Sequence, residues 1–263
     1  MGETTLMVMI SRFGQPQLPA LLMLHGFLGS KDDWSILMPR LSQYFHCICI
    51  DLPGHGTNVD TLNSPGLHQT AELIVSKMHS MGYMQFHVLG YSLGGRIALH
   101  IADDYADSLL SLTLESAHPG LQDAQQQAAR AKSDSIWAKK LQHMPIADFL
   151  SLWYQQLIAI RRSNDPQRLT NCYMTTSLSL QQDCRTVLES LTCPCHFMYG
   201  VDDKKFAQVA IDWQATLAES GLGTLQLHPL HAAGHNIHSL HPQLFTDTLL
   251  ALLCLDPLTD PKE

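Results

Sequence analysis

The stretch Val88-Leu-Gly-Tyr-Ser-Leu-Gly-Gly-Arg-Ile-Ala98 places one serine between two glycines, directly after an apolar run. Residues 86–89 are typical of a buried strand, and residues 95–105 are predicted to form a helix. An abrupt turn from strand to helix strains the residue at its tip, and side chains two positions away on either side would collide there. The sequence therefore predicts that Ser92 stands on such a turn, with its hydroxyl exposed above a sheet.

Apolar runs alternate with segments of helical periodicity on both sides of this turn, as in the βαβ units of a mostly parallel sheet. Further buried strands are predicted at residues 21–24, 47–50, 109–115, 196–199 and 225–228. Helices are predicted after Ser30, where Ser30 and Asp33 resemble a capping box, and at residues 71–81 and 242–255. The fold class is therefore α/β, a mostly parallel sheet flanked by helices.

Residues 121–191 contain no strand-like run, only helical sequence with bulky apolar anchors. We interpret this segment as a helical cap, or lid, inserted in a core formed by residues 1–120 and 192–263. A chain of 263 residues, 45% of them hydrophobic, can bury one sizeable core of this kind.

Composition excludes several classes of function. The net charge is −8 and no basic run exceeds two residues, so we expect no nucleic-acid partner. The N-terminal stretch has no basic region before its short apolar segment, and no apolar run approaches a membrane span, so we expect a cytoplasmic protein without membrane contact. Seven scattered cysteines indicate reduced thiols, and without a metal-binding spacing we expect no metal.

A serine alone is a weak base and nucleophile, so an acid and a histidine are expected downstream in the order Ser, Asp, His. Asp202 and Asp203 both follow the strand predicted at residues 196–199. We favour Asp203 as the acid, with Asp202 as a solvated turn residue. His235 follows a glycine in the loop after the last predicted strand, which suits a tight turn presenting its ring. The neighbouring histidines are assigned surface or structural roles: His231, His238 and His241.

Charge that develops on a substrate oxygen requires backbone donors. Leu93 follows the serine and supplies one N–H, and Phe27, in the loop after the first predicted strand, supplies the second. Arg96 lies one helical turn beyond Ser92 and is expected at the same mouth. The lid adds Arg130 and one of Arg161 and Arg162. In an acidic chain, arginines near a serine predict a substrate that bears carboxylates.

Six segments together resemble one known family, the MenH synthases of bacterial menaquinone biosynthesis, which have the α/β-hydrolase fold. They are Leu24-His-Gly-Phe27, Asp51-Leu-Pro-Gly-His-Gly56, Gly90-Tyr-Ser-Leu-Gly-Gly-Arg96, Glu115-Ser-Ala-His-Pro-Gly-Leu-Gln122, Trp153-Tyr-Gln-Gln156 and Ala233-Gly-His-Asn236. The first, second and last occur across α/β hydrolases, whereas the other three are more specific to this family.

The resemblance implies a carbon–oxygen lyase without a cofactor. Such an enzyme eliminates pyruvate from 2-succinyl-5-enolpyruvyl-6-hydroxy-3-cyclohexene-1-carboxylate and forms 2-succinyl-6-hydroxy-2,4-cyclohexadiene-1-carboxylate. The implied partner is this small polycarboxylate, and a monomer is the working hypothesis. The implied triad is Ser92, Asp203 and His235, and the implied oxyanion donors are Phe27 and Leu93. The implied substrate-binding residues are Tyr91, Arg96, Arg130 and Trp153.

One departure from the family concerns the lid. Residues 157–164 carry Arg161 and Arg162 directly after the Trp-Tyr-Gln-Gln segment, where the family has a dozen or so residues before its next arginine. We therefore predict a shortened lid, in which either Arg161 or Arg162 takes the role of that arginine.

Two rival functions are compatible with the same residues. An esterase, thioesterase or C–C bond hydrolase would use the same triad, and would turn over neutral activated esters quickly. A non-catalytic receptor of this fold would often lack one triad member, whereas candidates for all three members are present here.

Overall fold

The computed structural model describes residues 9–154, 165–220 and 224–254; Arg161 and Arg162 lie outside these ranges. In the described ranges the strands form one seven-stranded sheet in the order β1-β3-β2-β4-β5-β6-β7. The strands are β1 (Met9–Phe13), β2 (Ala20–Leu24), β3 (His46–Asp51), β4 (Phe86–Tyr91), β5 (Leu109–Glu115), β6 (Cys195–Gly200) and β7 (Leu225–Leu230). Only β1 runs antiparallel to its neighbour; the other pairs are parallel.

The predicted strands are confirmed, and their burial explains why they were visible in the sequence. Every residue of β2 and β3 is buried, as expected for parallel strands covered on both faces. The edge strand β1 was not predicted from the sequence. Its residues are half-buried or exposed, so it carries no continuous apolar run.

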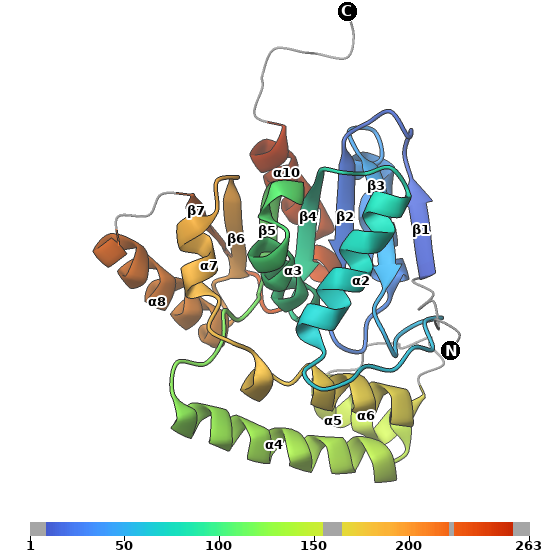
Figure 1. Cartoon of the computed structure of the whole chain (residues 1–263), viewed down its shortest axis with the longest axis vertical. Helices are drawn as coiled ribbons and strands as arrows, with labels where there is room; N and C mark the ends of the chain where they lie inside the picture. Colours follow the sequence, from blue (N-terminus) through green and yellow to red (C-terminus); the bar gives the residue numbers. More distant parts are fainter. Residues whose placement is uncertain (1–8, 155–164, 221–223, 255–263) are drawn as a thin grey trace, which may run out of the picture.

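Helices cover both faces of the sheet (Figure 1). One apolar cluster contains residues of α2 (Leu67–Ser80), α3 (Leu93–Asp104), α7 (Arg185–Ser190) and α8 (Lys204–Ser220). The cluster on the other face contains residues of η1 (Lys31–Leu37), α1 (Met38–Leu41), α9 (Ile237–Leu240) and α10 (Pro242–Leu253). The predicted capping box of Ser30 and Asp33 is present, but it begins the 3-10 helix η1 rather than an α-helix. The α/β fold class is confirmed.

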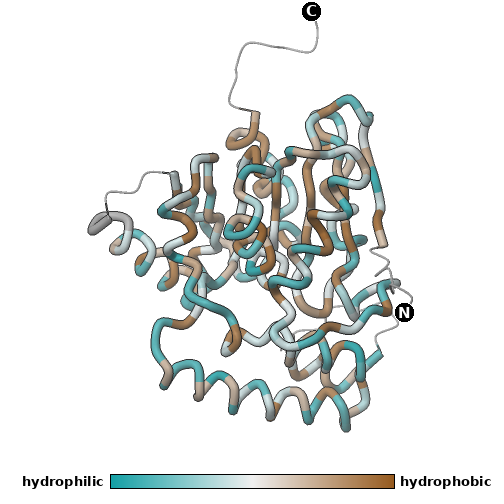
Figure 2. The backbone as a smooth tube through the Cα atoms, in the orientation of Figure 1, coloured by the Kyte–Doolittle hydropathy of each residue, from teal (hydrophilic) through white to brown (hydrophobic). Residues whose placement is uncertain are grey.

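Between β5 and β6 the described residues form four further helices at one end of the sheet (Figure 1): α4 (Ala124–His143), α5 (Ile146–Tyr154), α6 (Pro166–Thr175) and the short η3 (Leu178–Leu180). Helices α4, α5 and α6 share an apolar cluster with Leu28, a residue of the core. Figure 2 shows apolar residues concentrated in the sheet and mostly polar ones along α4. In contrast, α7 places Val187 and Leu188 in the core cluster, so this helix packs with the sheet.

In the described ranges, no helix combines the length and the apolar character that a bilayer span requires.

Candidate active site

Ser92 occupies the turn between β4 and α3. Its φ of 49° lies in the left-handed region, and its N–H donates to the carbonyl of Glu115 at 2.9 Å. A Cβ on Gly94 would lie 2.1 Å from the carbonyl oxygen of Leu24, and one on Gly90 would lie 2.5 Å from the carbonyl oxygen of Gly94. Backbone segments therefore meet where the flanking side chains would stand, which is the collision expected from the sequence.

Asp203 and His235 lie within hydrogen-bond distance after two neighbouring strands. His235 Nδ1 donates to Asp203 Oδ2 at 2.8 Å, while Asp203 Oδ1 accepts from the N–H groups of Lys205 and Phe206 at the start of α8. Burial raises the pKa of Asp203, but its hydrogen bond with His235 and the charge of that ring outweigh burial and lower the pKa below its usual value. Asp203 is therefore a carboxylate at neutral pH, and the other ring nitrogen of His235, Nε2, is left as an acceptor.

Two aromatic rings fix the plane of His235. Phe206 stacks on the imidazole with centroids 4.9 Å apart, and Tyr91 lies 5.3 Å away at a tilt. Tyr91 also meets the ring of His238 edge-on. The loops that follow β6 and β7 approach each other closely at Gly200. A Cβ at this position would lie 2.1 Å from the carbonyl oxygen of Ala233.

Glu115 ties the loop that carries His235 to the centre of the sheet. Its carboxylate is fully buried, and Oε1 accepts from the N–H of Ile237 at 2.7 Å and from that of His238 at 3.1 Å. Oε2 lies 2.7 Å from His238 Nδ1. His238 therefore has a structural role, as the sequence analysis expected for the histidines beside His235.

Replacing Glu115 with alanine should destabilise this loop. Two buried N–H groups would lose their acceptor, which costs roughly 2–5 kcal/mol of the free energy of unfolding. Glu115→Gln should cost less, because an amide oxygen can still accept from both. Urea titration followed by circular dichroism measures both values. Equal stability of Glu115→Ala and the unaltered protein would contradict the anchoring role.

The loop after β2, which carries the predicted oxyanion donor Phe27, is held by two buried histidines. The N–H of Leu28 donates to His55 Nε2 at 3.1 Å, and that of Leu52 donates to His25 Nε2 at 3.0 Å. Burial, with a smaller contribution from His25, lowers the pKa of His55 to about 3. The ring therefore stays neutral and remains an acceptor at ordinary pH.

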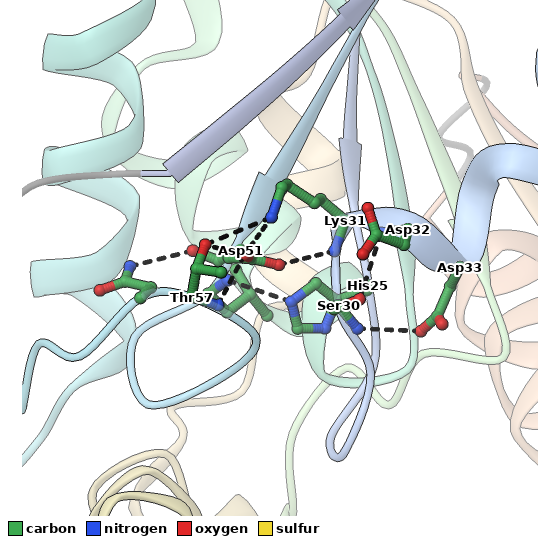
Figure 3. Close-up of polar contacts among 9 residues, drawn as sticks. His25, Ser30, Lys31, Asp32, Asp33, Asp51 and Thr57 are labelled. Carbon is green, nitrogen blue, oxygen red and sulfur yellow. Dashed lines mark hydrogen bonds and ion pairs between the residues drawn. The ribbon is translucent and has the colours of Figure 1, made fainter. Parts of the chain in front are cut away.

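Asp51 connects this loop to the end of β3 (Figure 3). Its fully buried carboxylate accepts from the N–H and the ammonium of Lys31, and from the N–H and hydroxyl of Thr57. Burial raises the pKa of Asp51, but the bonds from Lys31 and Thr57 outweigh it and lower the pKa below its usual value. This network fixes the path of residues 25–31 beside Ser92.

Ser92 and His235 lie at the junction of two cavities. The first has a volume of about 390 Å³, and the second about 410 Å³. Both cavities are also lined by Phe27 and Trp153. Tyr91 lines the second cavity, whereas Leu93 lines the first. No hydrogen bond joins the Ser92 hydroxyl to His235 within the described residues, and such bonds often tighten only when substrate binds.

Among the residues that the structure describes, three cationic side chains line the first cavity: Arg96, Arg130 and Lys205. Two hydrogen bonds hold the Arg96 side chain: Nη2 donates to the carbonyl of Thr176 at 2.7 Å, and Nε donates to the side chain of Gln181. Burial, followed by the charge of Arg130, lowers the pKa of the Arg96 guanidinium to about 9. Desolvation, again followed by Arg130, lowers the pKa of Lys205 below its usual value. An anion in this cavity would relieve the repulsion between these groups.

The same cavity contains one buried acid. Asp134, 1% exposed, accepts from Arg130 Nε at 2.7 Å, from the Tyr173 hydroxyl at 2.7 Å, and from the Ser177 hydroxyl. The contact with Nε orients the Arg130 guanidinium at the cavity.

The inserted helices contact the loop after β2 through aromatic rings. Trp153 packs against Phe27 at 5.3 Å and against Tyr173 at 5.7 Å, measured between ring centroids. Behind it, Phe149 stacks at 5.7 Å. The predicted residues Arg161 and Arg162 lie outside the described residues, so the structure places neither.

The structure thus brings together the described members of the predicted set: Ser92, Asp203, His235, Phe27, Leu93, Tyr91, Arg96, Arg130 and Trp153. Sequence reasoning missed Lys205, Phe206, Asp134, Tyr173 and Glu115. Lys205 and Phe206 lie two and three positions after Asp203, so a helix beginning after the acid was the one local signal for them.

Comparison with protein families matches residues 19–183 to the α/β-hydrolase fold. The chain is 33% identical over 258 residues to the 2-succinyl-6-hydroxy-2,4-cyclohexadiene-1-carboxylate synthase of Enterobacter sp. (strain 638), covering 93% of this chain and 95% of that relative. It is 34% identical to the synthase of the same name from Salmonella typhimurium, over 92% of this chain and 96% of the relative.

Among solved structures, MenH from S. aureus superposes with a TM-score of 0.83 at 24% identity, covering 94% of this chain and 97% of that one. A thermophilic esterase from Thermogutta terrifontis superposes with a TM-score of 0.74 at 19% identity, covering 94% and 93%. At these identities the superpositions show the common fold.

Proposed function

The chain belongs to the α/β-hydrolase fold family and, within it, to the 2-succinyl-6-hydroxy-2,4-cyclohexadiene-1-carboxylate synthases, and on that premise we propose how its site carries out the reaction. The substrate is 2-succinyl-5-enolpyruvyl-6-hydroxy-3-cyclohexene-1-carboxylate, and the products are pyruvate and the cyclohexadiene. The protein is thus a carbon–oxygen lyase of menaquinone biosynthesis. The reaction requires one base and a stabilised negative charge.

Ser92, His235 and Asp203 supply the base. His235 Nε2 accepts the proton of the Ser92 hydroxyl, and the serine oxygen takes the ring C–H proton of the substrate. The hydrogen bond from His235 Nδ1 to Asp203, 2.8 Å long, holds the tautomer that this transfer needs and stabilises the imidazolium that forms. No acyl-enzyme is required, which distinguishes this chemistry from ester hydrolysis.

The backbone N–H groups of Phe27 and Leu93 stabilise the charge. Loss of the ring proton places negative charge on the adjacent succinyl carbonyl oxygen, where preorganised donors are most effective. Leu93 is the first residue of α3, so the positive end of the helix dipole adds to its donor. The contacts of Leu28 with His55 keep the other donor's loop in place.

The elimination then proceeds without further reactants. The electron pair of the broken C–H bond forms a new ring double bond, the ring double bond already present shifts by one position, and the C–O bond to the enolpyruvyl group breaks. The enolate that leaves takes up, at its methylene carbon, the proton that His235 received from Ser92 and becomes pyruvate, while Ser92 keeps the ring proton on its hydroxyl. A conjugated diene remains in the ring.

The observation that carries this proposal is the gathering of Arg96, Arg130 and Lys205 in the cavity that holds Ser92 and His235. A polycarboxylate would neutralise these cations, whereas a neutral ester would leave their charges uncompensated. We also propose that the protein acts in the cytoplasm as a monomer; all seven cysteines are unpaired, which suits a reducing compartment.

The test supplies the enolpyruvyl substrate to the purified protein. Pyruvate release, coupled to lactate dehydrogenase, should match the appearance of diene absorbance one to one. Rapid hydrolysis of a neutral aryl ester without pyruvate would instead identify an esterase.

Lys205 should contribute to substrate affinity. Lys205→Met removes one charge from the mouth of the cavity and should lower kcat/KM about tenfold, mainly through KM, because a charge-assisted contact contributes about 1.5 kcal/mol. Steady-state kinetics measure the effect. Lys204→Met is the matched control, because Lys204 is the neighbouring residue and its exposed side chain does not line the cavity. Equal kinetics of the two variants would remove Lys205 from the binding set.

A further inference from the structure

Helices α2 and α3 bring together two histidines and an aspartate outside the candidate active site. His68 is the second residue of α2, whereas His100 and Asp103 lie three positions apart on α3 and so share a face. One ring nitrogen from each histidine and one carboxylate oxygen of Asp103 lie within 4.8 Å of one another. His68 lies more than thirty positions from the other two, so local sequence spacing did not predict this set.

His100 shows most clearly that this cluster lacks a ligand. The side chain is 1% exposed, and neither ring nitrogen has a hydrogen-bond partner in the described part of the chain. Its ring lies edge-on to that of His68, with centroids 4.2 Å apart. Buried polar groups almost always have a partner, so an unpartnered imidazole facing a second histidine indicates that something can bind between them.

A hydrogen bond on the far side of the His68 ring suits metal binding. His68 Nδ1 donates to Asp104 Oδ2 at 2.6 Å, which leaves the lone pair on Nε2. A carboxylate on the far nitrogen is the usual partner of a metal-binding histidine, and Asp104 takes that place.

Asp103 completes the ligand set from the solvent side. Its Oδ2 accepts a hydrogen bond from the side chain of Gln182, which orients the carboxylate and leaves Oδ1 free to bind. The side chain is exposed, so an ion can enter from solvent. Zinc ligands lie about 3.3–3.6 Å apart, given bonds of about 2.0–2.2 Å, so small rotations of exposed side chains close the cluster around one ion.

We propose that His68, His100 and Asp103 bind one divalent transition-metal ion of the zinc type, which cross-links α2 to α3. Two imidazoles and one carboxylate, with water in the fourth position, favour zinc over the hard cation magnesium. The site is structural, since neither His68 nor His100 lines the cavities beside Ser92. Because α3 carries Ser92 and Arg96, the ion braces the helix on which the active site depends.

The experiment titrates zinc into the full-length, chelator-treated protein by calorimetry. One equivalent should bind, and cobalt should give the visible absorption of a tetrahedral site. Zinc at a hundredfold excess over Kd should raise Tm by about 5 °C, and magnesium should not. Absence of stoichiometric zinc binding would overturn the proposal.

Variants separate this site from adventitious binding. His68→Ala and Asp103→Asn should weaken zinc binding at least tenfold, and Asp104→Asn should weaken it tenfold to a hundredfold. His228→Gln is the matched control, because His228 Nε2 lies 3.2 Å from His196 Nδ1 in another close histidine pair. Asp103→Asn changes an exposed side chain, so it remains informative even if His68→Ala fails to fold. An equal loss of zinc affinity in His228→Gln, or no loss in the ligand variants, would refute the site.

Discussion

Ser92→Ala should lower kcat/KM for pyruvate elimination by about three orders of magnitude. In the proposed mechanism the serine oxygen removes the ring proton, and positioned acid–base groups contribute roughly 10²–10⁴-fold to rate. Alanine cannot carry that proton, while the oxyanion donors and the cations remain. Substrate affinity, measured by calorimetry, should therefore change far less than turnover.

The control for this variant is Ser116→Ala. Ser116 follows β5 and shares the φ of 49° found at Ser92, so alanine meets the same backbone strain at both positions. Its hydroxyl is buried and has no hydrogen-bond partner among the described residues. Loss of activity in Ser92→Ala alone would assign the effect to the hydroxyl. Near-full activity of Ser92→Ala would refute the mechanism.

Asp203→Asn should lower kcat by roughly 10³–10⁴-fold, the scale known for loss of the triad acid in serine proteases. The amide can donate to His235 Nδ1, which then holds its proton on Nε2 and cannot accept the one from Ser92. The side-chain oxygen can still accept from the N–H groups of Lys205 and Phe206, so the fold should persist. Turnover of the enolpyruvyl substrate measures the fall in kcat, and a circular dichroism spectrum shows whether the fold persists.

Asp202→Asn distinguishes the two acids that the sequence left open. Asp202 is exposed, whereas the carboxylate of Asp203 contacts His235. The Asp202→Asn replacement should change kcat less than twofold, since a solvated turn residue contributes little to the stability or the geometry of the site. A fall equal to that of Asp203→Asn would contradict the proposed role of Asp203.

The turn at Ser92 was predictable because its signal is local. The strand, the glycines and the helix are contiguous, and each reflects a steric requirement of the next. The same holds for the capping box at Ser30, whose partners are three residues apart. The strand β1 was not predicted, because a half-exposed edge strand does not need a continuous run of apolar residues and so has no local signal.

The support of the site could not be predicted, because it depends on contacts between distant residues. Glu115 reaches N–H groups more than a hundred positions away, and in the sequence it looks like any acid that ends a strand. Asp134 is a lid residue whose partner Tyr173 lies on another helix. Sequence spacing does not predict the contacts of either Glu115 or Asp134, since the chain between the partners can have any length.

Phe27 joins the chemistry of the site to its enclosure. The backbone of this residue is a proposed donor, and its ring packs against Trp153 of the inserted helices. Because the N–H of the next residue, Leu28, donates to His55 Nε2, the position of that backbone donor does not depend on the ring contact with Trp153. Outward movement of the inserted helices would therefore uncover the Phe27 ring and leave its backbone in place.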